Sequence, residues 1–266
     1  MKVTSNGKVR LAWDERGDGT PLLLIMGHTF PSSMWYSQIP ALSERHRVVW
    51  FDNRGTGDSG ATRHATVSDL AADARAVMDA AGMDRAHVYG VSMGGGVALQ
   101  LAYETPQRVD SLVLGCTGFK GEDVPGRGRA ARLMYFLPMR LLRPVFRKGL
   151  YGPGVPSELI EKDLDVLMSA RKSGRGLLGQ VEAMRSYDLD ADRVSQIRIP
   201  SLVLHGDLDT TVPLHRGQSL ADALPDSRLI VYPGANHGYH VGIETTVHRD
   251  VLNFLSSVDV SAATAR

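Results

Sequence analysis

Short apolar runs alternate along this chain with segments whose apolar residues recur at helical spacing. The segment 66–82, for example, places its larger apolar side chains on one face of a predicted helix. The runs between such segments are short, continuous and rich in Val, Leu and Ile, which is typical of strands buried on both faces. The seven predicted strands cover residues 9–15, 21–27, 47–53, 86–91, 111–117, 201–207 and 228–234.

Alternation of strands and helices predicts an α/β fold with a mostly parallel central sheet and helices on both faces. The alternation stops after Gly118, and residues 119–198 are helical in pattern with two joints rich in Pro and Gly. Strand character resumes at Ile199. We therefore predict a core domain formed by residues 1–118 and 199–266, with residues 119–198 inserted as a helical cap, or lid.

Composition narrows the class of protein. The chain of 266 residues suits one large domain with an insertion, and its 30 basic and 29 acidic side chains show no imbalance that would favour nucleic acid or a membrane. A single cysteine, Cys116, excludes an internal disulfide and fits a reducing compartment. No signal-peptide pattern opens the chain, and no apolar run approaches the roughly 18 residues of a membrane span. We expect a cytoplasmic protein, compatible with a homo-oligomer, that acts on a small molecule.

The strongest chemical signal is a serine between two glycines. Gly90, Ser92 and Gly94 form the pattern G-x-S-x-G at the junction of a predicted strand and a predicted helix. A sharp turn there needs small neighbours, lifts the hydroxyl above the sheet and leaves the N–H of Met93 free to donate to an oxyanion. The alternative is a serine that only caps the helix. A second match at residues 57–61 is not followed at once by a helix and is interpreted as a turn.

A reactive serine needs a base, and the base needs an acid to orient it. In hydrolases built on α/β sheets, the order along the chain is serine, acid, histidine. Asp209 and His237 each follow a predicted strand, at the sheet edge where such folds carry their sites. Asp207 and His240 remain alternatives for the acid and the base.

Two further patterns resemble parts of a metal site and of a dinucleotide site, but neither pattern is complete. His237 and His240 are spaced like a metal pair, but no motif supplying a third ligand accompanies them. Residues 55–60 match G-x-G-x-x-G, yet no helix begins on these glycines, as a dinucleotide site requires. We therefore predict neither a metal nor an organic cofactor.

The chain resembles the α/β-hydrolase-fold serine hydrolases. The resemblance rests on "LLLIMGH", "FDNRGTGDS", "YGVSMGG", "HGDLDTTVP" and "GANHG". It implies that Ser92 is the nucleophile, Asp209 the acid and His237 the base. It also implies that the backbone N–H groups of His28 and Met93 form the oxyanion hole. Serine at position 92 argues against the dehalogenases and epoxide hydrolases of this fold, which carry aspartate there.

Within that family, the segments 34–60 and 90–114 most resemble the esterase and enol-lactonase branch. The resemblance implies a serine hydrolase that cleaves carboxylic esters or lactones of a small to medium apolar substrate through an acyl-enzyme. The alternatives are an enzyme similar to 3-oxoadipate enol-lactonase, a carbon–carbon bond hydrolase, and a ligand-binding protein that keeps the hydrolase frame.

The cap segment 127–148 combines seven basic residues, no acidic residue and many apolar ones. This pattern favours a lid that is apolar inside and basic outside. A helix on a membrane surface and an ordinary solvated helix are the alternatives, and Pro138 and Pro144 weaken the first of them. The side chains expected to contact substrate are Met134, Phe136, Met139 and Phe146.

Overall fold

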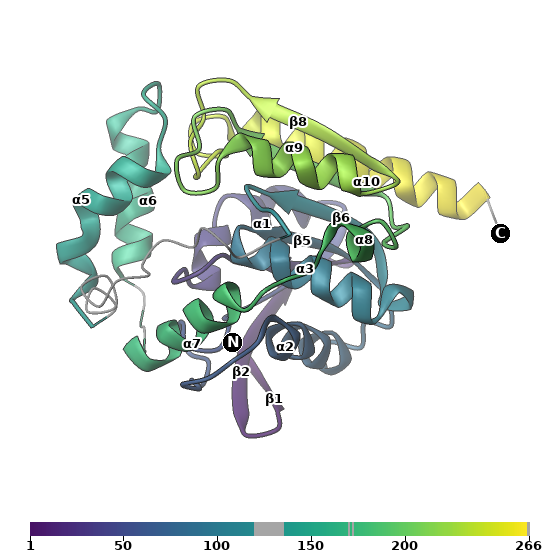
Figure 1. The fold of residues 1–266 in the computed structure, drawn as a ribbon, viewed down its shortest axis with the longest axis horizontal. Coiled ribbons are helices and arrows are strands. Elements are labelled where there is room, and N and C mark those ends of the chain that lie inside the picture. Colours follow the sequence, from purple (N-terminus) through teal and green to yellow (C-terminus); the bar gives the residue numbers. More distant parts are fainter. Residues whose placement is uncertain (120–135, 170, 172, 265–266) are drawn as a thin grey trace.

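A central sheet of eight strands organises the molecule (Figure 1). The computed structural model describes residues 1–119, 136–169, 171 and 173–264. The strand order is β1-β2-β4-β3-β5-β6-β7-β8; β2 is antiparallel to both β1 and β4, and all other pairs are parallel. The strands are β1 (Lys2–Asn6), β2 (Val9–Arg16), β3 (Thr20–Ile25), β4 (His46–Phe51), β5 (Ala86–Val91), β6 (Val109–Gly115), β7 (Ser201–Gly206) and β8 (Ser227–Tyr232).

The sheet confirms the predicted α/β fold with mostly parallel strands, and it contains all seven predicted strands. The eighth, β1, was not predicted, because its five residues are mostly polar and exposed. It pairs with β2 through a tight hairpin in which Asn6 is followed by Gly7, with φ of 57°. The two loop residues are Gly7 and Lys8, and glycine at the first loop position is typical of such a turn, so the sequence did contain the information.

Helices cover both faces of the sheet. One apolar core lies between the sheet and the face covered by α2, α3, α8 and α9. A second core lies on the other face, under α1 and α10, and extends to α5 and α6. The helices are α1 (Gln38–Leu42), α2 (Val67–Ala80), α3 (Met93–Glu104), α5 (Met139–Leu150), α6 (Ser157–Met168), α7 (Gly174–Arg185), α8 (Ala191–Val194), α9 (Leu214–Ala223) and α10 (Glu244–Thr264).

The helices α5 to α8 follow one another between β6 and β7, and α5 and α6 pack together beside the sheet (Figure 1). Arg143 and Arg147 of α5 form ion pairs with Glu161 of α6, and Arg143 also contacts Asp165 at 2.8 Å. These basic residues thus pair with the neighbouring helix. The division of the chain into a core and a cap at residues 118 and 199 stays a prediction.

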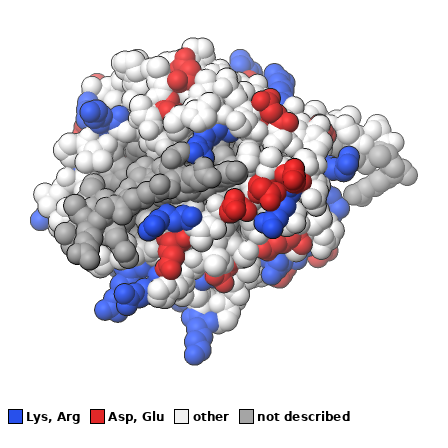
Figure 2. Space-filling view, in the orientation of Figure 1, with Lys and Arg blue, Asp and Glu red and all other residues white. Residues whose placement is uncertain are grey.

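Charged side chains of both signs lie next to one another on the face shown in Figure 2, as expected from the nearly balanced composition. No helix within the described ranges is both long enough and apolar enough to cross a bilayer.

Candidate active site

Ser92 occupies the sharp turn between β5 and α3. Its φ of 55° and ψ of −119° are a strained combination for a residue with a side chain. A Cβ atom on Gly90 would collide with the backbone oxygen of Gly94, and one on Gly94 would collide with that of Ile25. The turn therefore requires glycine on both sides of the serine. It is held in place by a 2.8 Å hydrogen bond from the N–H of Ser92 to the oxygen of Gly115.

Asp209 and His237 form a buried pair at the carboxyl ends of β7 and β8. Oδ2 of Asp209 lies 2.7 Å from Nδ1 of His237. The other oxygen, Oδ1, accepts hydrogen bonds from the N–H groups of Thr211 and Val212, both at 2.8 Å. Burial raises the pKa of Asp209, but the hydrogen bonds from His237 and these N–H groups outweigh it and hold the pKa below its ordinary value. Asp209 is thus an anion fixed on both oxygens.

The alternative acid and base occupy different surroundings. Asp207 is exposed, and its Oδ1 accepts from the N–H of Gly234 at 2.7 Å. His240 lines the same cavity as His237, and burial lowers the pKa of its imidazole. His205 lies within β7, where its Nε2 donates to the oxygen of Val212 at 2.8 Å. Among these residues, His237 is the histidine that the structure places within hydrogen-bonding distance of Asp209.

A cavity of about 400 Å³ brings Ser92 and His237 together. Both residues line it, and so do His28 and Met93, whose N–H groups were expected to bind the oxyanion. The rest of the wall is mostly apolar and comes from the β3–α1 region, α5 and α7. It includes Met26, Phe30, Met34, Trp35, Met139, Leu142, Phe146, Leu177 and Met184.

The four side chains expected to contact substrate have different positions. Met139 and Phe146 line the cavity, and the ring of Phe146 packs edge-on against Phe30 with centroids 5.7 Å apart. Phe136 is 58% exposed and does not line the cavity, so its placement does not support the expected contact. Phe136 lies just before α5, and its side chain faces solvent. Met134 lies outside the described residues.

The loop that follows β3 runs directly over the serine. A Cβ atom on Gly27 would lie 3.3 Å from Cβ of Ser92, so glycine allows this close approach. The next residue, His28, directs its ring to the amide of Gln180 on α7, with Nδ1 of His28 2.9 Å from Oε1 of Gln180. The same Oε1 accepts from the N–H of Thr29 at 3.2 Å. Burial lowers the pKa of His28 to about 4, although the bond to Gln180 opposes the shift.

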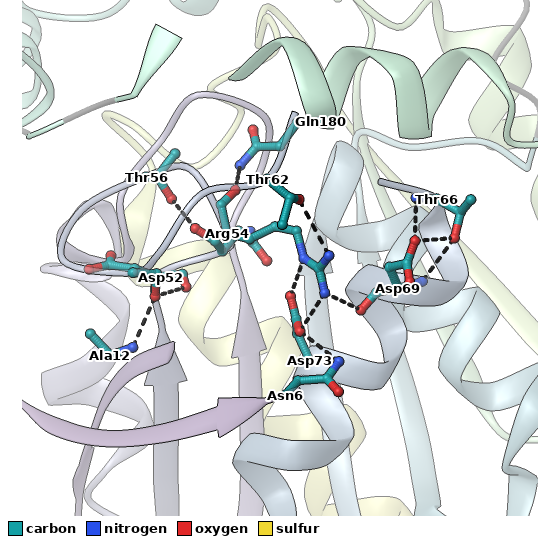
Figure 3. A network of polar contacts seen from close by, with 12 residues as sticks. Asn6, Ala12, Asp52, Arg54, Thr56, Thr62, Thr66, Asp69, Asp73 and Gln180 are labelled. Carbon is teal, nitrogen blue, oxygen red and sulfur yellow. Dashed lines mark hydrogen bonds and ion pairs between the residues drawn. The ribbon is translucent and has the colours of Figure 1, made fainter. Parts of the chain in front are cut away.

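Gln180 also reaches the loop after β4. Its Nε2 donates to the backbone oxygen of Arg54 at 2.8 Å (Figure 3). The guanidinium of Arg54 in turn forms two hydrogen bonds to the carboxylate of Asp73 on α2, at 2.6 and 2.7 Å. The Gln180 amide therefore ties the loop over Ser92 to a buried ion pair in the core. Nothing in the sequence indicated this role for Gln180, because its three partners are distant in the chain.

The glycine-rich stretch 55–60 wraps around a carboxylate of the protein itself. Oδ2 of Asp52 accepts from the N–H of Asp58 at 2.9 Å, and Oδ1 accepts from both the N–H and the hydroxyl of Ser32 at 2.8 Å. Gly57 has φ of 53°, and a Cβ atom there would collide with the Asp52 carboxylate. These glycines thus serve a tight loop around Asp52 (Figure 3).

A buried carboxylate on α6 also lines the cavity. Asp163 is 2% exposed and accepts hydrogen bonds from the hydroxyls of Tyr36, at 3.0 Å, and Tyr151, at 2.7 Å. Burial and the neighbouring Asp163 raise the pKa of both tyrosines. Nothing in the sequence distinguishes this residue, because a single aspartate in an amphipathic helix resembles an ordinary solvated position.

Two groups of potential metal ligands occur among the described residues. Cys116, His205 and Asp209 form one, which shares Asp209 with His237 and so belongs to the candidate active site. His46, His87 and Asp259 form the other, at the opposite ends of the strands. In the described part of the chain, neither group contains His240.

Comparisons with known proteins agree with this architecture. The family model of the alpha/beta hydrolase fold matches residues 20–152, and a second model, described as TAP-like protein, matches residues 181–265. The "Putative carbamate hydrolase RutD" of Variovorax paradoxus is 32% identical over 93% of this chain and 96% of its own length.

Two solved structures show the same fold. A hydrolase from Pseudomonas aeruginosa has 29% sequence identity and a TM-score of 0.82, covering 96% of this chain and 97% of its own. The enol-lactonase from Burkholderia xenovorans has a TM-score of 0.87 at 23% identity, covering 96% of this chain and 100% of its own. From the matching family model, the similar relatives and the observed sheet, we conclude that this chain is a hydrolase that belongs to the alpha/beta hydrolase fold family.

Proposed function

We propose that this hydrolase cleaves carboxylic esters or lactones of small to medium apolar acids through an acyl-enzyme on Ser92. The observation that carries the proposal is the 2.7 Å contact between Nδ1 of His237 and Oδ2 of Asp209. His237 lines the same cavity as Ser92, which lies on its strained turn. A hydroxyl, an imidazole and an oriented carboxylate in one cavity are the groups that acyl transfer needs.

The reaction begins with attack by Oγ of Ser92 on the ester carbonyl. Nε2 of His237 accepts the hydroxyl proton, and Asp209 holds Nδ1–H and so stabilises the imidazolium that forms. The negative oxygen of the tetrahedral intermediate accepts hydrogen bonds from the N–H groups of His28 and Met93. Met93 is the first residue of α3, where backbone N–H groups have no partner within the helix.

The tetrahedral intermediate then collapses. The bond to the alcohol breaks, and His237 donates its proton to the leaving oxygen, which gives a free alcohol and an acyl ester of Ser92. Water, activated by the same imidazole, hydrolyses this ester and regenerates Ser92. A lactone follows the same course, except that the alcohol stays attached to the acyl chain. The cycle is complete without a metal or an organic cofactor.

The cavity supports the proposal of a small to medium apolar substrate. Its volume of about 400 Å³ lies at the lower end of the range for small-molecule sites, and its wall is mostly apolar. Methionine side chains at positions 26, 34, 139 and 184 adapt to different shapes. Apolar acyl chains of medium length should therefore bind better than charged acyl chains.

Carbamates are a second candidate substrate class, favoured by relatives named "Putative carbamate hydrolase RutD", one of them 32% identical. A carbamate offers a carbonyl that Ser92 would attack in the same way, but its nitrogen weakens the electrophile. Asp163 provides a buried acceptor on the cavity wall that an N–H group would suit. Its oxygens already accept from two tyrosines, so an N–H donor would have to share them.

A substrate panel tests the proposal. We would measure kcat/KM for p-nitrophenyl esters of graded acyl length, for lactones and for aryl carbamates, with Ser92→Ala as the blank. The proposal predicts that an ester or a lactone has the highest value and that Ser92→Ala abolishes its turnover. If a carbamate had the highest kcat/KM, the substrate class would be carbamates and not esters or lactones. Turnover of esters by Ser92→Ala at more than a tenth of the wild-type rate would refute the mechanism.

A further inference from the structure

Two histidines lie at the edge of the sheet opposite Ser92. His46 is the first residue of β4, and His87 is the second residue of β5. The strand register pairs them with Thr20 and Leu22 of β3, which lie two residues apart and so share a face. That is the face covered by α10, because Leu22 belongs to the same apolar core as the buried residues of that helix.

The helix α10 brings a carboxylate to these imidazoles. Its apolar stripe packs on the sheet at intervals of four residues, through Val247, Val251 and Leu255. Asp259 continues the stripe at the same interval, and its Oδ1 lies 3.0 Å from Nε2 of His87. One ring nitrogen of His46, one of His87 and one oxygen of Asp259 all lie within 4.8 Å of one another.

Hydroxyl groups form hydrogen bonds with the remaining side-chain atoms of this cluster, which are Nδ1 of each histidine and Oδ2 of Asp259. Thr20 Oγ1 donates to Oδ2 of Asp259 at 3.2 Å, so it is left to accept from Nδ1 of His46 at 2.7 Å. This leaves Nε2 of His46 with a free lone pair, and among the described residues that buried atom has no hydrogen-bond partner. Nδ1 of His87 lies 2.8 Å from the hydroxyl of Ser111.

We propose that His46, His87 and Asp259 form a binding site for one divalent transition-metal ion, best suited to Zn²⁺ and separate from the candidate active site. Two imidazoles and a carboxylate are characteristic zinc ligands. Hydroxyl partners that fix the second nitrogen of each ring are the outer contacts that zinc-binding histidines use. His46 and His87 are each 2% exposed, which provides a rigid, dry wall for the ion.

The geometry requires a small adjustment. Zinc ligands at about 2.0–2.1 Å from the ion in a tetrahedral arrangement lie roughly 3.3 Å apart. Asp259 can supply the movement, because its side chain is 35% exposed and it lies close to the C-terminal end of α10. The same exposure leaves a fourth position for water. An ion bound here would join α10 to β4 and β5 and stabilise the folded state.

The test is a titration of the full chain, without a histidine tag, after treatment with a chelator. Calorimetry with ZnCl₂ should show one site per chain, and Co²⁺ should give visible absorption typical of a tetrahedral site. His87→Gln and Asp259→Asn should each weaken Zn²⁺ binding at least tenfold while ester turnover stays unchanged. His64→Gln is the matched control, because His64 also contacts a carboxylate, Glu182 at 2.9 Å, but is exposed. It should bind Zn²⁺ like the wild type.

Two results would overturn the proposal. One is a folded wild-type chain that binds no Zn²⁺. The other is Zn²⁺ binding that survives both substitutions, as it would if the ion occupied Cys116, His205 and Asp209, where it would also inhibit turnover. Because Asp259 is partly exposed, Asp259→Asn keeps the test decisive even if His87→Gln does not fold.

Discussion

Oε1 of Gln180 lies 2.9 Å from Nδ1 of His28 and 3.2 Å from the N–H of Thr29, so one amide oxygen holds both residues of the loop over Ser92. Gln180 itself does not line the cavity. Under the proposed mechanism it positions the loop that carries the oxyanion donor, and it connects α7 to the loop after β4 through the oxygen of Arg54.

Gln180→Ala should lower kcat about tenfold or more and leave KM nearly unchanged, because the N–H of His28, proposed as an oxyanion donor, loses its support. It should also lower the free energy of unfolding by about 1–3 kcal/mol, because buried polar partners are left unpaired. Steady-state kinetics and urea unfolding measure the two effects. Gln180→Glu is the matched control: it keeps the acceptor for His28 and should retain more of kcat. Equal kcat in both variants would argue against the positioning role.

The two aspartates after β7 should differ in their effect on activity. Asp209→Asn should reduce kcat on the order of 10³–10⁴-fold, because the amide favours the wrong tautomer of His237. Asp207→Asn should change kcat far less, since Asp207 is exposed and bonds to the N–H of Gly234. Initial rates with p-nitrophenyl butyrate compare the variants. The reverse order would assign the acid role to Asp207.

Stability should fall as the pH is lowered from about 6.5 towards 4. The folded protein holds the pKa of His28 at about 4, below the ordinary value of 6.5, because burial disfavours the imidazolium. The unfolded chain therefore binds a proton in this range that the folded chain does not, and stability present above pH 6.5 is lost on acidification. The loss attributable to His28 is at most about 3 kcal/mol.

Urea unfolding at pH 7.5 and pH 5 tests this dependence on His28. The wild type should lose more free energy of unfolding between the two values than His28→Asn does. Burial also lowers the pKa of His46 and His205, so the variant should keep part of the dependence. An identical loss in wild type and variant would show that His28 does not contribute.

Two phenylalanines near α5 make a matched pair. Phe146→Ala should lower kcat/KM for bulky acyl or aryl esters about tenfold or more and should barely affect p-nitrophenyl acetate. Phe136→Ala should change neither value, because Phe136 is 58% exposed and does not line the cavity. Kinetics with the two ester sizes, together with the melting temperature, separate selectivity from stability. Equal losses on both esters for Phe146→Ala, with an unchanged melting temperature, would remove its side chain from the substrate site.

Short sequence patterns predicted the fold well, because its turns and strands depend on residues that are close together in the sequence. The turn at Ser92 needs glycines two positions away on either side, and such a requirement is visible in a short motif. The seven predicted strands were evident from their apolar runs. The edge strand β1 was missed because its residues are mostly polar, although Gly7 in its turn was a usable signal.

Residues that act through distant partners were not predictable in this way. Gln180 meets His28 at a separation of 152 positions, and His87 meets Asp259 at a separation of 172. Asp163 reaches the cavity because α6 packs beside the sheet, and two tyrosine hydroxyls stabilise its buried carboxylate by donating hydrogen bonds to it. Periodicity predicts which face of a helix is apolar, but it does not tell which buried polar residue meets which partner.

Mass spectrometry of the quenched reaction detects the proposed acyl-enzyme itself. The protein would be mixed with a p-nitrophenyl ester, stopped in acid within the first turnover and digested. If Ser92 is the nucleophile, the mass of the acyl group appears on the peptide that contains Ser92, and it is absent from Ser92→Ala. Hydrolysis at the full rate with no acyl mass on that peptide, or with the acyl group on another residue, would contradict an acyl-enzyme on Ser92.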